Sequence, residues 1–77
     1  MDPKPDKQVL IDLIKIKMPY GKYQGRLLCD IPLHYLVWMN QKDAFPNGKI
    51  GFLLKNLLEI KTNELEPILW KLKELYK

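Results

Sequence analysis

The residues best suited to chemistry lie in one short basic segment of the N-terminal half. Four cations and no acids occur between residues 15 and 26, namely Lys15, Lys17, Lys22 and Arg26. Gly21 and Gly25 bracket the tip of this segment, and glycine allows the positive φ of a tight turn that exposes backbone amides. Amides and cations together contact phosphate, and the ring of Tyr23 can stack on an unpaired base. The segment therefore predicts nucleic-acid binding.

A purely structural interpretation of the same segment stays open. In that interpretation the glycines serve only the turn, Lys22 and Arg26 are solvated, and Tyr20 and Tyr23 pack on the helices. The segment is not a nucleotide-binding P-loop, because no Ser or Thr follows the lysine to hold a metal ion. The residues that we predict to bind nucleic acid are Lys17, Gly21, Lys22, Tyr23, Gly25 and Arg26.

No other group of residues predicts catalysis. His34 is the single histidine, no cysteine or carboxylate stands at ligand spacing from it, and the chain contains no serine. Cys29 lies in an apolar stretch, where a buried and unreactive thiol is expected, although a Cys29–His34 dyad is conceivable. The acids are not clustered as a two-metal nuclease requires. We therefore predict no enzyme, no cofactor, no metal site and no small-molecule substrate.

These residues are positioned by a mostly helical chain. Asp6 predicts the N-cap of a first helix that continues through about Ile14. From Ile16 the apolar residues alternate, and the glycines that follow predict a short hairpin over residues 16–29. Pro19 confines that hairpin to an edge or to very short strands. The predicted fold class is α+β, mostly α, with about four helices and one short antiparallel β-hairpin between the first two.

Three further helices are predicted after the hairpin. Pro32 predicts the start of the second helix, Asn47 the N-cap of the third, and Asn63 with Glu66 the N-cap of the fourth. Gly51 within the third helix predicts the close approach of another backbone, because a helical glycine otherwise costs about 1 kcal/mol.

The aromatic residues of the later helices allow two interpretations. Tyr35 and Trp38 share one helical face and could form a stacking platform for bases. A small domain needs large apolar side chains in its core, however, so we expect Trp38 inside and the Tyr35 hydroxyl against the hairpin. Trp70 is expected to be partly buried. Asp30 is expected to cap the second helix or to pair with Arg26.

Length and composition limit the classes of protein. The 77 residues suit one domain over 1–77, with residues 1–5 as a disordered lead-in. A net charge of +4 permits attraction to nucleic acid or to an acidic partner without requiring either. One cysteine forms no intramolecular disulfide, and no apolar run approaches the roughly 20 residues of a membrane span. We therefore predict a cytoplasmic location and no membrane partner.

The most distinctive sequence reads Met18-Pro19-Tyr20-Gly21-Lys22-Tyr23-Gln24-Gly25-Arg26-Leu27-Leu28, then Ile31-Pro32 and Tyr35-Leu36-Val37-Trp38. It resembles a family of small bacterial proteins labelled putative quorum-sensing-regulated virulence factor. The resemblance runs from about Leu13 to Leu69, with Tyr20 where the family is expected to have phenylalanine. The Gly-Lys-x-x-Gly core with its Tyr-Leu-x-Trp is also similar to the C-terminal accessory domain of exonuclease X-like nucleases, whose catalytic acids belong to a separate domain. That similarity implies a module that contacts DNA or RNA through Gly21, Lys22, Gly25 and Arg26.

Two functions of different classes stay open. The first is a non-catalytic nucleic-acid-binding or nuclease-associated accessory module, in which Lys22 and Arg26 contact the phosphates of DNA or RNA. It predicts binding that weakens steeply with salt and has little sequence preference. The second is a protein–protein interaction or assembly module, such as a virulence-linked regulator, that uses an apolar strip on the last two helices. It predicts a protein partner or a homodimer, and little loss when Lys22 and Arg26 are changed.

Overall fold

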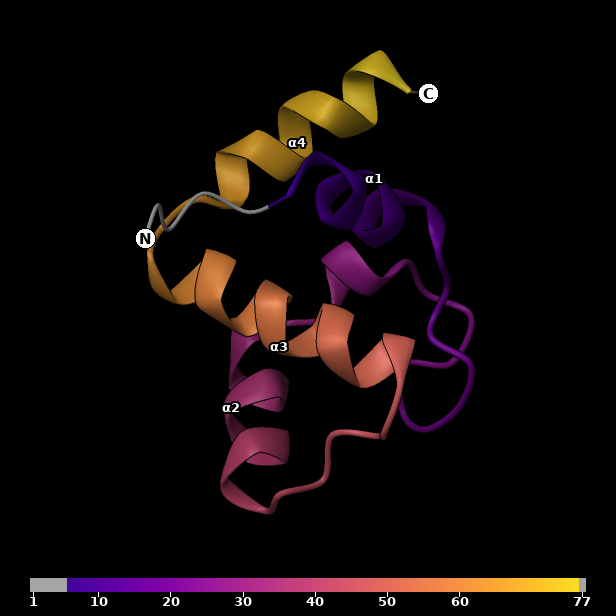
Figure 1. Cartoon of the computed structure of the whole chain (residues 1–77), viewed down its shortest axis with the longest axis vertical. Helices are drawn as coiled ribbons and strands as arrows, with labels where there is room; N and C mark the ends of the chain where they lie inside the picture. The colour runs from indigo at the N-terminus through magenta and orange to yellow at the C-terminus, as the bar shows by residue number, and fades with distance from the viewer. Residues whose placement is uncertain (1–5, 77) are drawn as a thin grey trace.

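Four α-helices and one short 3₁₀ helix make up the regular structure of residues 6–76, which are the residues that the computed structural model describes (Figure 1). Their bounds are α1 Lys7–Lys15, η1 Leu28–Asp30, α2 Leu33–Gln41, α3 Lys49–Thr62 and α4 Glu66–Leu75. The prediction of a mostly helical chain is confirmed. The predicted disordered lead-in, residues 1–5, lies outside the described residues.

The predicted β-hairpin over residues 16–29 is wrong, because residues 6–76 contain no strand and no sheet. Lys17 and Leu27 form one isolated antiparallel bridge, and the pairing extends no further as a ladder. Pro19 has no amide to continue the pairing on one side, and η1 begins directly after Leu27 on the other. The connection between α1 and η1, residues 16–27, is therefore a loop, which we call the basic loop.

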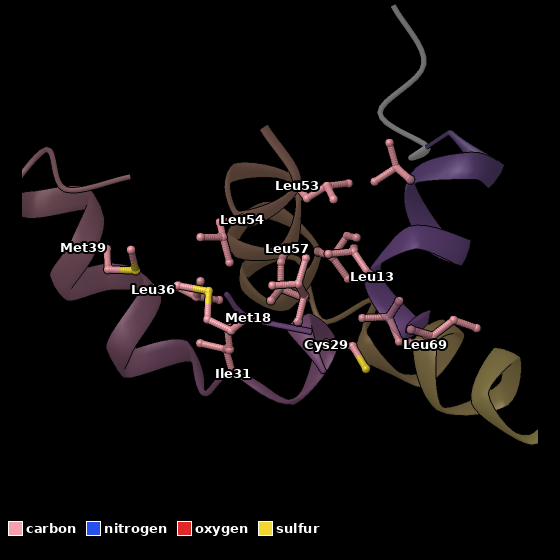
Figure 2. Packing of buried hydrophobic residues seen from close by; sticks show 14 residues of the cluster. Leu13, Met18, Cys29, Ile31, Leu36, Met39, Leu53, Leu54, Leu57 and Leu69 are labelled. Carbon is pink, nitrogen blue, oxygen red and sulfur yellow. The ribbon is translucent and has the colours of Figure 1, made fainter. Parts of the chain in front are cut away.

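The core lies between the helices and contains side chains from every one of them (Figure 2). Helix α3 packs against α2, α1 and η1, and α1 also packs against α4. Figure 2 shows Leu36 of α2 on one side of Leu57 of α3, with Leu13 of α1 and Leu69 of α4 on the other side. All four side chains are almost fully buried. As a result, α2 and α4 lie at opposite ends of the longest axis of the molecule (Figure 1).

The start of α3 depends on a close backbone contact. A Cβ added at Gly51 would lie 1.7 Å from the carbonyl oxygen of Pro46, a distance that no side chain tolerates. The predicted backbone approach at Gly51 is thus confirmed. The predicted N-cap at Asn47 is wrong, because the cap residue is Gly48, with a φ of 85° and no side-chain hydrogen bond. The chain reverses at Gly48 to bring Pro46 onto the helix, and this places Asn47 outside the capping position.

The N-terminal ends of α1, α2 and α4 agree with the sequence prediction in two cases and differ from it in the third. Asp6 caps α1 as predicted, since its carboxylate accepts from the Gln8 amide at 3.2 Å. Pro32 directly precedes α2. The predicted N-cap of the last helix at Asn63 is wrong, because Asn63 ends α3 and Leu65 precedes α4.

The end of α3 is a Schellman motif. The Leu65 amide donates to the Ile60 carbonyl at 2.9 Å, and the Glu64 amide donates to the Lys61 carbonyl at 3.2 Å. Glu64 occupies the left-handed position of this motif with a φ of 59°. Asp43 has a φ of 50° in the corresponding turn after α2, where the Ala44 amide donates to the Met39 carbonyl.

Candidate nucleic-acid interface

The basic loop is held by backbone hydrogen bonds at its neck. The Met18 amide donates to the Arg26 carbonyl at 2.8 Å, and the Met18 carbonyl accepts from the Gly25 amide at 2.9 Å. Gly21 and Gly25 both have a φ of +86°, a conformation that strains other L-residues. The Met18 side chain is buried in the core. The loop therefore stands on an ordered base, and its tip faces solvent.

The loop carries its positive charge without neutralising partners. Lys17, Lys22 and Arg26 are all exposed. The ion pairs of residues 6–76 all lie elsewhere and join Lys49 to Asp12, Lys61 to Glu66 and Lys73 to Asp30. Because no carboxylate of residues 6–76 forms an ion pair with the loop cations, these cations produce a local positive potential that attracts polyanions.

Backbone amides at the loop tip are open beside these cations. Within the described chain, the amides of Gly21, Lys22 and Tyr23 donate to no backbone carbonyl, whereas the Arg26 amide closes a turn on the Tyr23 carbonyl at 3.0 Å. Successive open amides form concavities that bind anions. The structure thus brings together all six predicted residues in one loop: Lys17, Gly21, Lys22, Tyr23, Gly25 and Arg26. Their binding of nucleic acid stays a prediction.

An unbroken row of aromatic rings leads from the loop onto α2. The Lys22 ammonium lies 5.6 Å from the centre of the Tyr23 ring. Tyr23 meets Tyr35 edge to face with ring centres 4.8 Å apart, and Tyr35 stacks on Trp38 at 5.6 Å and 29°. We call Tyr23, Tyr35 and Trp38 the aromatic row. A Cβ at Gly21 would lie 3.7 Å from the Tyr35 hydroxyl, so Tyr35 also packs closely under the loop.

The predicted core position of Trp38 is wrong, because the side chain is 49% exposed. Helix α2 buries Leu36 and Met39 instead. The sequence of α2 is apolar on nearly every face, and Leu33 and Val37 are also exposed. Its periodicity therefore does not distinguish the inner face from the outer one. The sequence allowed Trp38 as part of a stacking platform, but we expected it in the core and left it out of the predicted site.

The residues considered for catalysis are not assembled into a reactive group. Cys29 is buried, and burial, with a smaller contribution from Asp30, raises the pKa of its thiol to about 11. The thiol therefore stays protonated at neutral pH, as predicted for an unreactive cysteine. His34 lies exposed in the first turn of α2. Residues 6–76 contain no cluster of three or more His, Cys, Asp or Glu side chains that could hold a metal ion.

Asp30 neither caps α2 nor pairs with Arg26, so that prediction is wrong. Its carboxylate accepts from the Lys73 ammonium at 2.9 Å and links η1 to α4. This hydrogen bond raises the pKa of Lys73. The arrangement leaves Arg26 free of Asp30 and so contributes to the unpaired charge of the basic loop.

None of the helices found in residues 6–76 combines the length and the apolar character needed to cross a bilayer.

Comparison with known proteins identifies the family. A family model described as putative quorum-sensing-regulated virulence factor matches residues 6–72. The chain belongs to this family. Two relatives named "Uncharacterized protein YpeB", from Escherichia coli strain K12 and Escherichia coli O157:H7, are each 46% identical over 68 residues. The matched region covers 88% of this chain and 94% of each relative, and no solved structure matches. The family resemblance carried by the loop sequence is thereby confirmed.

Proposed function

We propose that the chain is a non-catalytic nucleic-acid-binding module and that the basic loop makes the contact. One observation carries the proposal: within residues 6–76 the exposed side chains of Lys17, Lys22 and Arg26 form no ion pair, and the loop-tip amides of the same segment donate to no backbone carbonyl. Phosphate oxygens are the ligands that such amides and cations bind. From the resemblance of the Gly-Lys-x-x-Gly core and the Tyr-Leu-x-Trp of α2 to the accessory domain of exonuclease X-like nucleases, we further propose that the module acts beside a nuclease.

Lys22→Ala/Arg26→Ala tests the proposal by removing two cations from the loop. Fluorescence anisotropy with labelled DNA and RNA, measured from low to moderate salt, is expected to show an affinity about tenfold or more weaker than that of the unaltered chain. The negative slope of log affinity against log salt is expected to become shallower by about 1.8 on duplex DNA and by about 1.4 on single strands, because each phosphate contact contributes roughly 0.9 or 0.7, respectively.

The matched control is Lys55→Ala/Lys71→Ala, which removes the same charge from exposed positions on α3 and α4. This variant is expected to lose little affinity and little salt dependence. An equal loss of affinity in both double variants would mean that binding depends on the net charge of the chain and not on the basic loop. The proposal would be overturned if the unaltered chain bound no nucleic acid even at low salt.

A second candidate function, a protein-interaction or assembly module, has its own supporting observation. Large apolar side chains stand exposed on the last two helices, among them Phe52 on α3 and Trp70 on α4, the latter 58% exposed. Exposed apolar surface of this kind is typical of protein interfaces. Light scattering on the purified chain tests whether it forms a homodimer. A homodimer that depends on Trp70 would give twice the monomer mass for the unaltered chain and the monomer mass for Trp70→Ala.

A further inference from the structure

Trp38 is a large aromatic side chain that the fold leaves 49% exposed. The inner face of α2 is filled by Leu36 and Met39, and the Trp38 ring lies outside that contact. Stacking on Tyr35 at 29° holds the indole in a defined orientation while about half of its surface stays open to solvent. A large, oriented and half-exposed indole is suited to stacking on a planar ligand.

The aromatic row connects the indole of Trp38 to the positive charge of the basic loop. The aromatic row begins beside the Lys22 ammonium and ends at Trp38, with ring-to-ring steps of 4.8 and 5.6 Å. A ligand that spans the row would therefore meet cations at one end and an open ring at the other. A polynucleotide strand offers the matching pair of groups, phosphates and flat bases, within a few nucleotides.

We propose, building on the proposed nucleic-acid binding, that Trp38 stacks on an unpaired base and that the occupant of this surface is a single-stranded polynucleotide. The faces of bases inside a duplex are covered by their neighbours, so a duplex offers phosphates to the loop and no internal base to Trp38. Phosphates and base faces are common to DNA and RNA. Strands of both kinds are therefore expected to bind, and duplexes of either kind to bind more weakly.

Tryptophan fluorescence reports the stacking directly, because the chain has two tryptophans that can be separated. Trp70→Phe leaves Trp38 as the single emitter, and Trp38→Phe leaves Trp70 on α4 at the far end of the molecule (Figure 1). Titration with a ten-residue thymidine or uridine oligonucleotide is expected to quench the emission of Trp38 and to leave that of Trp70 unchanged. Base-paired oligonucleotides of the same length are expected to quench neither.

Affinity gives a second readout that does not depend on fluorescence. Trp38→Ala is expected to weaken binding of the single strand about tenfold and to change binding of the duplex less than twofold. Trp70→Ala is the matched control and is expected to change neither affinity, with the fold of each variant checked by circular dichroism.

The outcomes separate this inference from the proposal on which it rests. Binding that depends on Lys22 and Arg26 but leaves Trp38 emission unchanged, or that is equal for strand and duplex, overturns the inference and retains the basic loop as a phosphate site. No binding of any oligonucleotide overturns both. If Trp38→Ala does not fold, the quenching of Trp38 in the Trp70→Phe variant still decides the question.

Discussion

At the scale of single residues, packing changes the chemistry of Cys29 and couples it to pH. Burial raises the pKa of the thiol from 9.0 to about 11. Between these values the unfolded chain has lost the thiol proton and the folded chain still holds it, so unfolding releases a proton. The free energy of unfolding therefore falls as pH rises from about 9 to about 11. Below pH 9 both states hold the proton, and the contribution does not change with pH.

Urea denaturation of the unaltered chain and of Cys29→Ala between pH 8 and 11 measures this coupling. The variant is expected to be less stable at pH 8, because it leaves a small cavity in the core. Its decline with pH is expected to be shallower than that of the unaltered chain, since the buried thiol no longer contributes. Parallel declines in the two proteins would contradict the assignment of the pH dependence to Cys29.

At the scale of elements, the turn between α3 and α4 contains a residue that glycine would replace favourably. Glu64 adopts a φ of 59°, a conformation that costs most L-residues about 1 kcal/mol or more. Glu64→Gly is therefore expected to raise the free energy of unfolding by about 1 kcal/mol, as measured by urea denaturation.

The matched control for this substitution is Glu59→Gly within α3, also an exposed glutamate. There the backbone is helical, so glycine is expected to lower the free energy of unfolding by about 1 kcal/mol. Opposite signs for the two substitutions support the left-handed conformation at Glu64. A loss of stability in both would contradict it.

The sequence predicted a local feature correctly where the residue type at that position has one main structural role. Asp6 was predictable as a cap because a carboxylate before a helix satisfies free amides, and Gly51 because a helical glycine needs a packing reason. Asn63 and Glu66 matched a capping box, yet Asn63 is the C-cap residue of α3 within the Schellman motif that ends this helix. Glu66 instead pairs at 2.9 Å with Lys61, whose side chain is only 7% exposed.

Features that are determined by tertiary packing could not be predicted from the sequence. The alternation around Ile16 and Met18 was real, since Met18 is buried, but only one bridge forms before η1 begins. The six predicted residues of the basic loop were found together because they are close in sequence. Trp38 was wrongly assigned to the core because its exposure depends on which face of an almost wholly apolar helix meets α3.

At the scale of the whole molecule, the two candidate functions use different surfaces. The aromatic row ends on α2, whereas Trp70 belongs to α4 at the opposite end of the longest axis (Figure 1). Substitutions at one end therefore leave the other surface intact. Nucleic-acid binding and protein association can be tested independently in the same chain, and a positive result for one does not exclude the other.

The most direct test of the basic loop as the nucleic-acid contact is amide NMR of the labelled chain during titration with a short single-stranded oligonucleotide. We expect the largest shift changes at the amides of Gly21, Lys22, Tyr23 and Gly25 and at the indole N–H of Trp38, with little change along α4. Shift changes concentrated on α4, or none at low salt, would contradict the assignment of the basic loop as the binding site.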